Sequence, residues 1–221
     1  MTSELTVHRR APMSGTAASV VVFLHGYGAD GQDLLGLADP LAPHMPDTLF
    51  LAPDAPTRSP LNPMGYQWAP IPHMDGSTME QARTAMLASV DAVNAMLDGL
   101  IAETGLGPEK FLLFGFSQGT MLSLHLAPRR AVALAGVVGF SGMLLVPEVL
   151  SAEKVVTLPI LLVHGDADEV VPFAARDAAA QALLKEGFSV YAHTMPGTGH
   201  GIAPDGLSVA LAFMRAQFGI S

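Results

Sequence analysis

Short apolar runs alternate with longer segments of helical periodicity along most of the chain. Most of these runs are continuously apolar, which is typical of strands buried on both faces of a parallel sheet. An initial segment, residues 4–9, alternates weakly and predicts an antiparallel edge strand. The predicted parallel strands lie at residues 19–24, 48–52, 110–114, 134–140, 158–163 and 188–194.

The clearest helical pattern follows Ser77, a good N-cap residue with Glu80 three positions later, as in a capping box. Apolar residues then recur at steps of three and four until the predicted helix ends near Gly105. Strands that alternate with helices predict an α/β fold: a mostly parallel central sheet with helices on both faces and right-handed crossovers. Further helical patterns cover residues 32–41, 118–127, 173–185 and 206–218.

These elements and their connections use nearly all of the 221 residues. The sequence therefore predicts one domain, residues 1–221, with no separate lid domain. The longest irregular segment, residues 53–78, holds six of the 17 prolines and the only tryptophan, Trp68. It follows the end of a predicted strand, where α/β sheets bind ligands, so we expect it to shape the entrance to a site.

Charge and hydropathy narrow the classes of protein. The 11 Lys and Arg residues against 20 Asp and Glu give a net charge of −9, which argues against a nucleic-acid partner. Charged residues are only 14% of the chain and the mean hydropathy is +0.39, which raises the question of a membrane segment. The candidate considered, residues 131–146, is shorter than the roughly 18 residues a spanning helix needs, and it contains Ser141. We therefore expect no membrane span and a cytoplasmic protein, with the apolar excess buried in strands.

Cysteine and glycine usage exclude some chemistries and suggest another. The chain has no cysteine, so disulfides, a cysteine nucleophile and thiolate metal sites are absent. Gly26, Gly28 and Gly31 form a GxGxxG pattern between a predicted strand and helix, and Asp54 follows the next strand. This arrangement is a candidate dinucleotide site, but so many glycines make the pattern common by chance.

A second glycine motif, GxSxG, centres on Ser117 between Gly115 and Gly119. It follows the predicted strand at 110–114 and opens an apolar helix, which is the strand–turn–helix context that a nucleophile elbow requires. The sharp turn needs small flanking residues and lifts the serine hydroxyl above the sheet. The sequence thus predicts Ser117 as a nucleophile; the alternative is a glycine-rich turn with an incidental serine.

A serine nucleophile needs a base, and the base needs an orienting acid that precedes it in the chain of an α/β-hydrolase. Asp166, Asp168 and Glu169 all follow the predicted strand at 158–163. We prefer Asp168, because it heads the run into the apolar residues 170–172, and we expect Asp166 to form a turn or support its neighbours.

The predicted base is His200, which lies between two glycines after the last predicted strand and before the last helix. Glycines on both sides let a histidine on a loop approach Ser117. His164 stands at a strand end and is expected to be a buried structural residue, and His193 and His125 fall within a predicted strand and helix.

Acyl transfer also requires two backbone N–H groups aimed at the developing oxyanion. One is expected from Gln118, directly after the nucleophile, and the other from the loop that begins at Leu24. The glycines at positions 26–31 then let the backbone approach a substrate carbonyl rather than a pyrophosphate. The sequence has no HExxH motif for a metal site.

The joint pattern resembles the phospholipase/carboxylesterase family of α/β-hydrolases, which includes acyl-protein thioesterases. The resemblance implies a triad of Ser117, Asp168 and His200, an oxyanion hole from the N–H groups of Leu24 and Gln118, and often dimers. It also implies hydrolysis of carboxylic esters or thioesters without a metal or cofactor. The motifs that carry it are LHGYGADG (24–31), APDAP (52–56), GFSQG (115–119), GFSGML (139–144), HGDADEVVP (164–172) and GTGHGI (197–202).

Substrate contacts depart from the family pattern. Many relatives have Trp-Phe-Asp in the long loop, where this chain has Gln-Trp-Ala-Pro at 67–70. Methionines 64, 74 and 79 form either an adaptable apolar wall or ordinary packing. We expect Trp68, Met143 and Leu144 to line a site for short or medium acyl chains, so the predicted function is a serine carboxylesterase that acts on small-molecule esters. The alternatives are a thioesterase or lysophospholipase, a dinucleotide-binding oxidoreductase, and a non-catalytic ligand-binding homologue.

Overall fold

A seven-stranded sheet forms the centre of the computed structural model, which describes residues 5–220. The strand order is β1-β3-β2-β6-β7-β8-β9, and every neighbouring pair is parallel except β1 with β3. The strands are β1 Val7–Arg10, β2 Ser19–Leu24, β3 Thr48–Pro53, β6 Phe111–Phe116, β7 Gly136–Phe140, β8 Ile160–Gly165 and β9 Val190–Met195. The predicted mostly parallel sheet and its antiparallel edge strand are confirmed, although residue 4 lies outside the described part.

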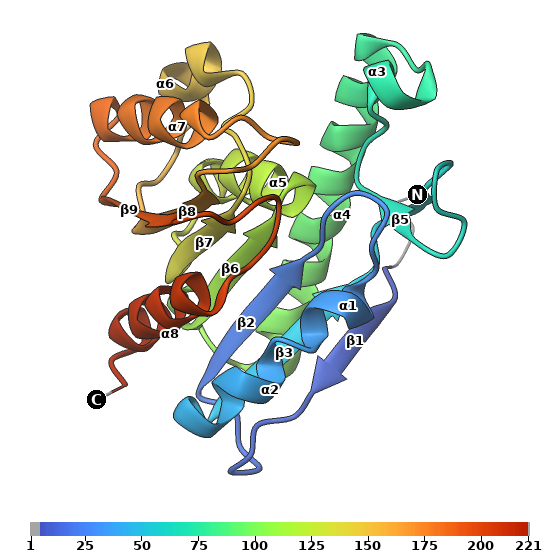
Figure 1. Ribbon diagram of the computed structural model, residues 1–221. Helices are drawn as coiled ribbons and strands as arrows, with labels where there is room; N and C mark the ends of the chain where they lie inside the picture. The colour runs from blue at the N-terminus through green and yellow to red at the C-terminus, as the bar shows by residue number, and fades with distance from the viewer. Residues whose placement is uncertain (1–4, 221) are drawn as a thin grey trace.

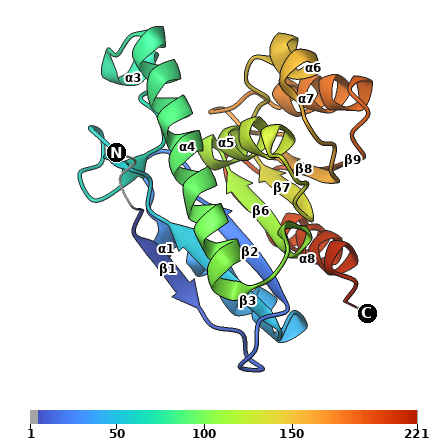
Figure 2. The ribbon, with the colours of Figure 1, turned by 180° about the vertical axis from the view of Figure 1, so that it is seen from behind.

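Helices cover both faces of this sheet (Figures 1 and 2). One face carries α4 Met79–Thr104, α5 Gln118–Leu126 and α7 Ala174–Lys185. The other carries α1 Gly31–Leu35, α2 Ala38–Leu41 and α8 Pro204–Phe218. The small elements are β4 Thr57–Arg58, β5 Tyr66–Gln67, α3 Pro72–Asp75, α6 Leu150–Glu153 and the 3₁₀ turns Ala42–His44, Pro108–Lys110, Ala127–Arg129 and Pro147–Val149.

Two apolar cores result, because successive side chains of a buried strand point to opposite faces. In β2, Val20, Val22 and Leu24 enter the core beneath α4, α5 and α7, whereas Val21 and Phe23 enter the core beneath α1, α2 and α8. All five side chains are fully buried, which explains the continuously apolar strands.

Two helix predictions need correction. The long helix starts one residue later than predicted: Thr78 is its N-cap and forms the capping box with Gln81, not Ser77 with Glu80. The Ser77 N–H instead donates to the Asp75 carboxylate, within the preceding turn. The single helix predicted over residues 32–41 is also wrong, since it divides at Gly36 into α1 and α2, with i→i+3 bonds at the junction.

Helix α4 is long and apolar enough to cross a membrane by length and composition alone, which was not predicted for this segment. In the structure it lies along the sheet, and its buried side chains join one of the two cores (Figure 2). Buried core helices pass the same length and composition test, so this single helix is weak support for a membrane segment.

The strand order places the first loop beside the elbow serine. From β2 the chain moves outward to β3 and then returns to β6 on the opposite side of β2. Connections therefore diverge from the carboxyl ends of β2 and β6, which is where open α/β sheets bind their ligands. Leu24 at the end of β2 pairs with Gly115 near the end of β6, so the loop after Leu24 meets the turn at Ser117.

Candidate active site

Ser117 occupies a strained turn between β6 and α5, with φ 53° and ψ −115°. A non-glycine residue in this region is costly and persists where the surroundings enforce it. The flanking glycines are required by close packing: a Cβ on Gly119 would lie 1.8 Å from the Leu24 carbonyl oxygen, and one on Gly115 would lie 2.5 Å from the backbone of Gly119. The elbow predicted from the motif is therefore present.

The end of β7 holds this turn in place. The Phe140 carbonyl accepts hydrogen bonds from the Ser117 N–H (2.9 Å) and from the Thr120 hydroxyl (2.7 Å). The segment that follows packs directly on the elbow, since a Cβ on Gly142 would lie 3.0 Å from the Ser117 carbonyl oxygen. Met143 and Leu144 come next and are half-buried and buried, so the structure brings this segment close to Ser117.

Asp168 lies on the turn after β8 with its side chain shut off from solvent. Its Oδ1 accepts the N–H groups of Val170 and Val171, both at 2.9 Å, and its Oδ2 contacts His200 Nδ1 at 2.8 Å. Burial by itself raises the pKa of the Asp168 carboxyl, but the hydrogen bonds from His200, Val171 and Val170 outweigh it. The pKa of Asp168 consequently lies below its ordinary value, and the group is a carboxylate at neutral pH.

His200 lies on the loop after β9, and its ring packs against that of Phe116, with centroids 4.9 Å apart. Phe116 immediately precedes Ser117, so the structure brings the predicted base to the nucleophile turn. Asp166 is exposed and plays the supporting part expected of it, because its Oδ1 accepts the Gly197 N–H (2.7 Å) and ties down the loop that carries His200. Glu169 is exposed.

The other candidate histidines have different surroundings. His193 pairs with Asp205 at 2.9 Å near the surface, and His125 is buried in α5, where burial lowers its pKa. His164 is buried at the end of β8, as predicted, with its Nε2 2.9 Å from the Val171 carbonyl. Within residues 5–220 no group of three or more His, Asp or Glu side chains is arranged to hold a metal ion.

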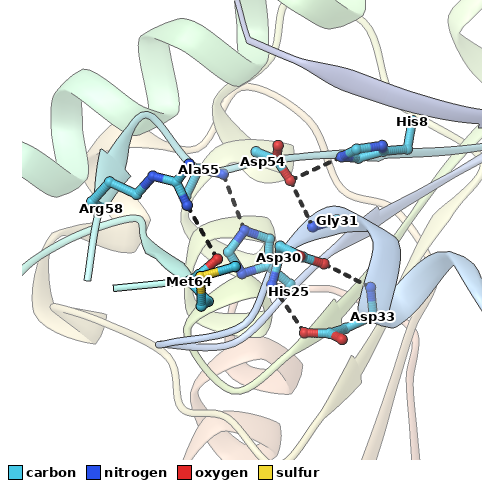
Figure 3. Close-up of polar contacts among 9 residues, drawn as sticks. All are labelled: His8, His25, Asp30, Gly31, Asp33, Asp54, Ala55, Arg58 and Met64. Atoms are coloured by element: carbon cyan, nitrogen blue, oxygen red, sulfur yellow. Dashed lines mark hydrogen bonds and ion pairs between the residues drawn. The ribbon is translucent and has the colours of Figure 1, made fainter. Parts of the chain in front are cut away.

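Backbone N–H groups of the first loop form hydrogen bonds within the protein, and Figure 3 shows the one from Gly31 to Asp54. Asp54 is buried and its Oδ1 accepts the Gly31 N–H (2.9 Å) while contacting His8 Nε2 (3.1 Å). The Gly28 N–H donates to the Tyr66 carbonyl at 2.8 Å. These groups are the acid and part of the backbone that a dinucleotide would use, so their engagement within the protein argues against the dinucleotide hypothesis.

Residues 53–78 are anchored to the first loop and to the elbow. The Trp68 indole N–H donates to the His25 carbonyl (2.8 Å). The Gln118 side chain accepts the Trp68 N–H (3.1 Å) and donates to the Ala69 carbonyl (2.7 Å). His25 in turn accepts the Ala55 N–H on Nε2 (3.0 Å), and burial lowers the pKa of His25. One buried network thus connects the long loop with the residue after the nucleophile.

These anchoring roles of Gln118 and His25 were not predicted from the sequence. The signals available in the sequence were a polar side chain at the first position of an apolar helix and a histidine at a strand end. Trp68 is only 1% exposed, so the structure shows it as the anchor of its loop, and contact with substrate stays a prediction.

Replacing Trp68 by Ala is expected to lower the free energy of unfolding by about 3–5 kcal/mol, because it empties a buried aromatic site. Trp68→Phe keeps an aromatic ring in the site but removes the hydrogen bond to the His25 carbonyl and part of the packing, so its loss should be smaller, about 1–3 kcal/mol. Because Trp68 is the only tryptophan, neither variant keeps a tryptophan fluorescence signal. Guanidinium unfolding of both variants is therefore followed by circular dichroism. Wild-type stability in both variants would contradict the anchoring role.

A strained serine lies between a strand and a helix of a mostly parallel sheet, and a His–Asp pair lies on the loops after two later strands. This arrangement defines the class of protein: the fold is that of the α/β-hydrolases. Within residues 5–220 the strand connections form no separate lid domain, as predicted.

Comparison with known proteins gives the family within this class. The family model described as phospholipase/carboxylesterase matches residues 11–218. The chain therefore belongs to the phospholipase/carboxylesterase family, as its motifs indicated, and is a hydrolytic enzyme.

Three relatives illustrate the range of the family. A probable carboxylesterase of Oryza sativa subsp. japonica is 35% identical, and the match covers 89% of this chain and 78% of the relative. An acyl-protein thioesterase 1 of Gibberella zeae is 28% identical over 95% of this chain and 96% of the relative. The crystal structure of esterase PE8 superposes with a TM-score of 0.92 at 39% identity and covers 97% of this chain and 99% of that one.

Proposed function

We propose that the chain is a serine carboxylesterase that uses Ser117 as nucleophile, His200 as base and Asp168 as the acid that orients His200. The observation that carries this proposal is the 2.8 Å contact between His200 Nδ1 and the buried Asp168 Oδ2, on a loop whose histidine ring packs beside the strained Ser117 turn. A carboxylate only accepts hydrogen bonds, so Nδ1 carries the hydrogen and Nε2 has a free lone pair.

The reaction follows from that tautomer. His200 Nε2 takes the Ser117 hydroxyl proton while Oγ bonds to the ester carbonyl carbon, and the carbonyl oxygen becomes an oxyanion. The imidazolium then gives its proton to the departing alcohol as the C–O bond breaks, leaving an acyl-enzyme. Water, deprotonated by His200, attacks the acyl carbon; the bond from that carbon to Ser117 Oγ then breaks, the imidazolium returns its proton to Oγ, and the acid is released. Asp168 stays ionised throughout and stabilises the imidazolium.

The oxyanion hole that we propose uses the Gln118 N–H and one N–H of the first loop. The first N–H groups of a helix have no intrahelical acceptor, and Gln118 is the first residue of α5. Leu24, the predicted second donor, is the last residue of β2 and pairs with Gly115. A Cβ on Gly26 would lie 3.3 Å from Ser117 Cβ, which favours a donor just beyond Leu24, and Leu24 itself stays a prediction.

Residues 53–78 are the long segment that borders the first loop, and hydrogen bonds anchor them to it. Because we expect this segment to shape the entrance to the site, its fixed position supports small acyl groups as substrates. We expect kcat/KM for nitrophenyl esters to be highest for short or medium acyl chains, tested by a series of increasing chain length. A preference for long, charged or peptide acyl groups would contradict this expectation. Trp68, Met143 and Leu144 stay the predicted contacts.

A thioesterase is the second candidate, because one relative is named as an acyl-protein thioesterase. The same triad cleaves both bonds, so the distinction is one of specificity. When an oxygen ester and a thioester with the same acyl chain are compared, we expect the oxygen ester to be cleaved with the higher kcat/KM. A higher kcat/KM for the thioester, or activity on an acylated peptide alone, would favour the thioesterase.

The cytoplasmic location and the homodimer stay proposals as well. Fractionation of the native cell tests the first. Size-exclusion chromatography with light scattering tests the second, by comparing the solution mass with the chain mass of 23.0 kDa.

A further inference from the structure

The Asp168 carboxylate has a second imidazole on the oxygen that faces His200. Oδ2 lies 2.8 Å from His200 Nδ1 and 3.2 Å from His164 Nε2. Both the Asp168 and His164 side chains are almost completely buried, at 0% and 1% exposure. The other oxygen, Oδ1, already accepts the backbone N–H groups of Val170 and Val171. Each oxygen of this buried charge therefore has two N–H groups around it.

The surroundings of His164 fix which of its atoms carries hydrogen. Its Nε2 lies 2.9 Å from the Val171 carbonyl oxygen, which can only accept, so Nε2 must be the protonated nitrogen. The same nitrogen also lies 3.2 Å from Asp168 Oδ2, so the protonated edge of the ring is in contact with the carboxylate as well. The His164 ring also makes a T-shaped contact with the ring of Phe173, with centroids 5.9 Å apart and an interplanar angle of 85°.

His164 also connects a strand of the sheet with the turn that follows it. It belongs to β8, which lies between β7 and β9, whereas Asp168 stands on the turn after the strand. Backbone N–H groups hold Oδ1 from within that turn, and His164 Nε2 contacts Oδ2 from the strand. Burying a polar ring is costly unless its hydrogen bonds are made, so an apolar side chain would suffice if packing were the only requirement.

We propose that His164 is a positioning residue for the predicted reaction: its Nε2–H fixes the Asp168 carboxylate in the rotation that directs Oδ2 at His200 Nδ1. This inference rests on the proposed triad and adds to it a residue that acts only through Asp168. When His200 becomes an imidazolium, the carboxylate must stay in place to stabilise it. An anchored carboxylate needs less free energy to reorganise at that step.

Three substitutions separate the hydrogen bond from the packing. His164→Phe keeps a ring and removes the N–H; His164→Gln places an amide N–H at about the same reach; His164→Asn carries an amide that is too short. We expect kcat to fall about 10- to 100-fold in the Phe and Asn variants with KM little changed, and less than about fivefold in Gln. Thermal unfolding verifies that each variant is folded. If His164→Phe does not fold, the comparison of His164→Gln with His164→Asn still tests the proposal.

A double-mutant cycle gives a result that a packing role cannot. The His164→Phe and His164→Asn changes are repeated in an Asp168→Asn background, where the carboxylate is gone. If His164 acts through Asp168, each change should cost less than about threefold there. His193→Phe is the matched control, because His193 also pairs with a carboxylate, that of Asp205, but on the adjacent strand and away from Ser117; its activity should equal that of the wild type.

The outcomes are distinct. A loss in kcat of the same size in both backgrounds, an equal loss in the Gln and Asn variants, or wild-type activity in folded His164→Asn would overturn the positioning role while leaving the triad intact. Wild-type activity in Asp168→Asn alone would overturn the proposed triad and this inference with it.

Discussion

Ser117→Ala is expected to reduce the kcat of ester hydrolysis by about 10⁴- to 10⁶-fold while the fold is kept, because it removes the nucleophilic oxygen and no other contact of the turn. The positive φ of Ser117 is imposed by the surrounding packing, and alanine bears the same Cβ. The bonds that hold the turn use the backbone N–H of residue 117 and the Thr120 hydroxyl, both of which remain.

Covalent labelling tests the same prediction without a turnover assay. A fluorophosphonate should add to Ser117 Oγ, with a P–O bond formed, fluoride released and the hydroxyl proton taken by His200. Intact mass spectrometry should show the adduct on wild type and not on Ser117→Ala. Ser123→Ala is the matched control: Ser123 is a buried serine of α5 whose hydroxyl donates to the Gly119 carbonyl, and the variant should be labelled and remain active within a few-fold. Hydrolysis by Ser117→Ala at near the wild-type rate would rule out Ser117.

Most of the sheet could be predicted because its inner strands are buried on both faces and therefore apolar along their whole length. Strand β2 occupies residues 19–24 as predicted, and β7 and β8 begin two residues later than predicted. The elements that were not predicted are short and held by polar contacts at long range. β4 and β5, for example, pair only with each other, and the N–H of Tyr66 in β5 bonds to Ala29, far away in the sequence.

The parts of the site whose geometry is determined by a short sequence motif could be predicted. The close packing at Gly119 and the turn at Ser117 follow from the GxSxG motif and its strand–helix context. The pairing of Asp168 with His200 required chain order, because the two residues lie 32 positions apart. No local pattern indicates that Trp68 would bond to His25 or that Gln118 would hold the long loop, because those contacts depend on the order of strands in the sheet.

Asp168→Asn is expected to lower kcat by about 10³- to 10⁴-fold. Two backbone N–H groups, those of Val170 and Val171, hold Oδ1, so the amide oxygen of asparagine should take that place. The amide NH₂ then replaces Oδ2 and faces His200 Nδ1, where two donors cannot bond. His200 must shift its hydrogen to Nε2, the atom that has to accept the Ser117 proton, and the base is lost.

Asp166→Asn is the control that tests the choice between the two acids. Asp166 is exposed, and its Oδ1 accepts the Gly197 N–H in the loop of His200, a bond that an amide oxygen can equally accept. Activity should therefore stay within a few-fold of wild type, measured as kcat for a nitrophenyl ester with thermal unfolding alongside. A larger loss at Asp166 than at Asp168 would exchange their roles, because only the acid that sets the His200 tautomer can produce a loss of several orders of magnitude without unfolding.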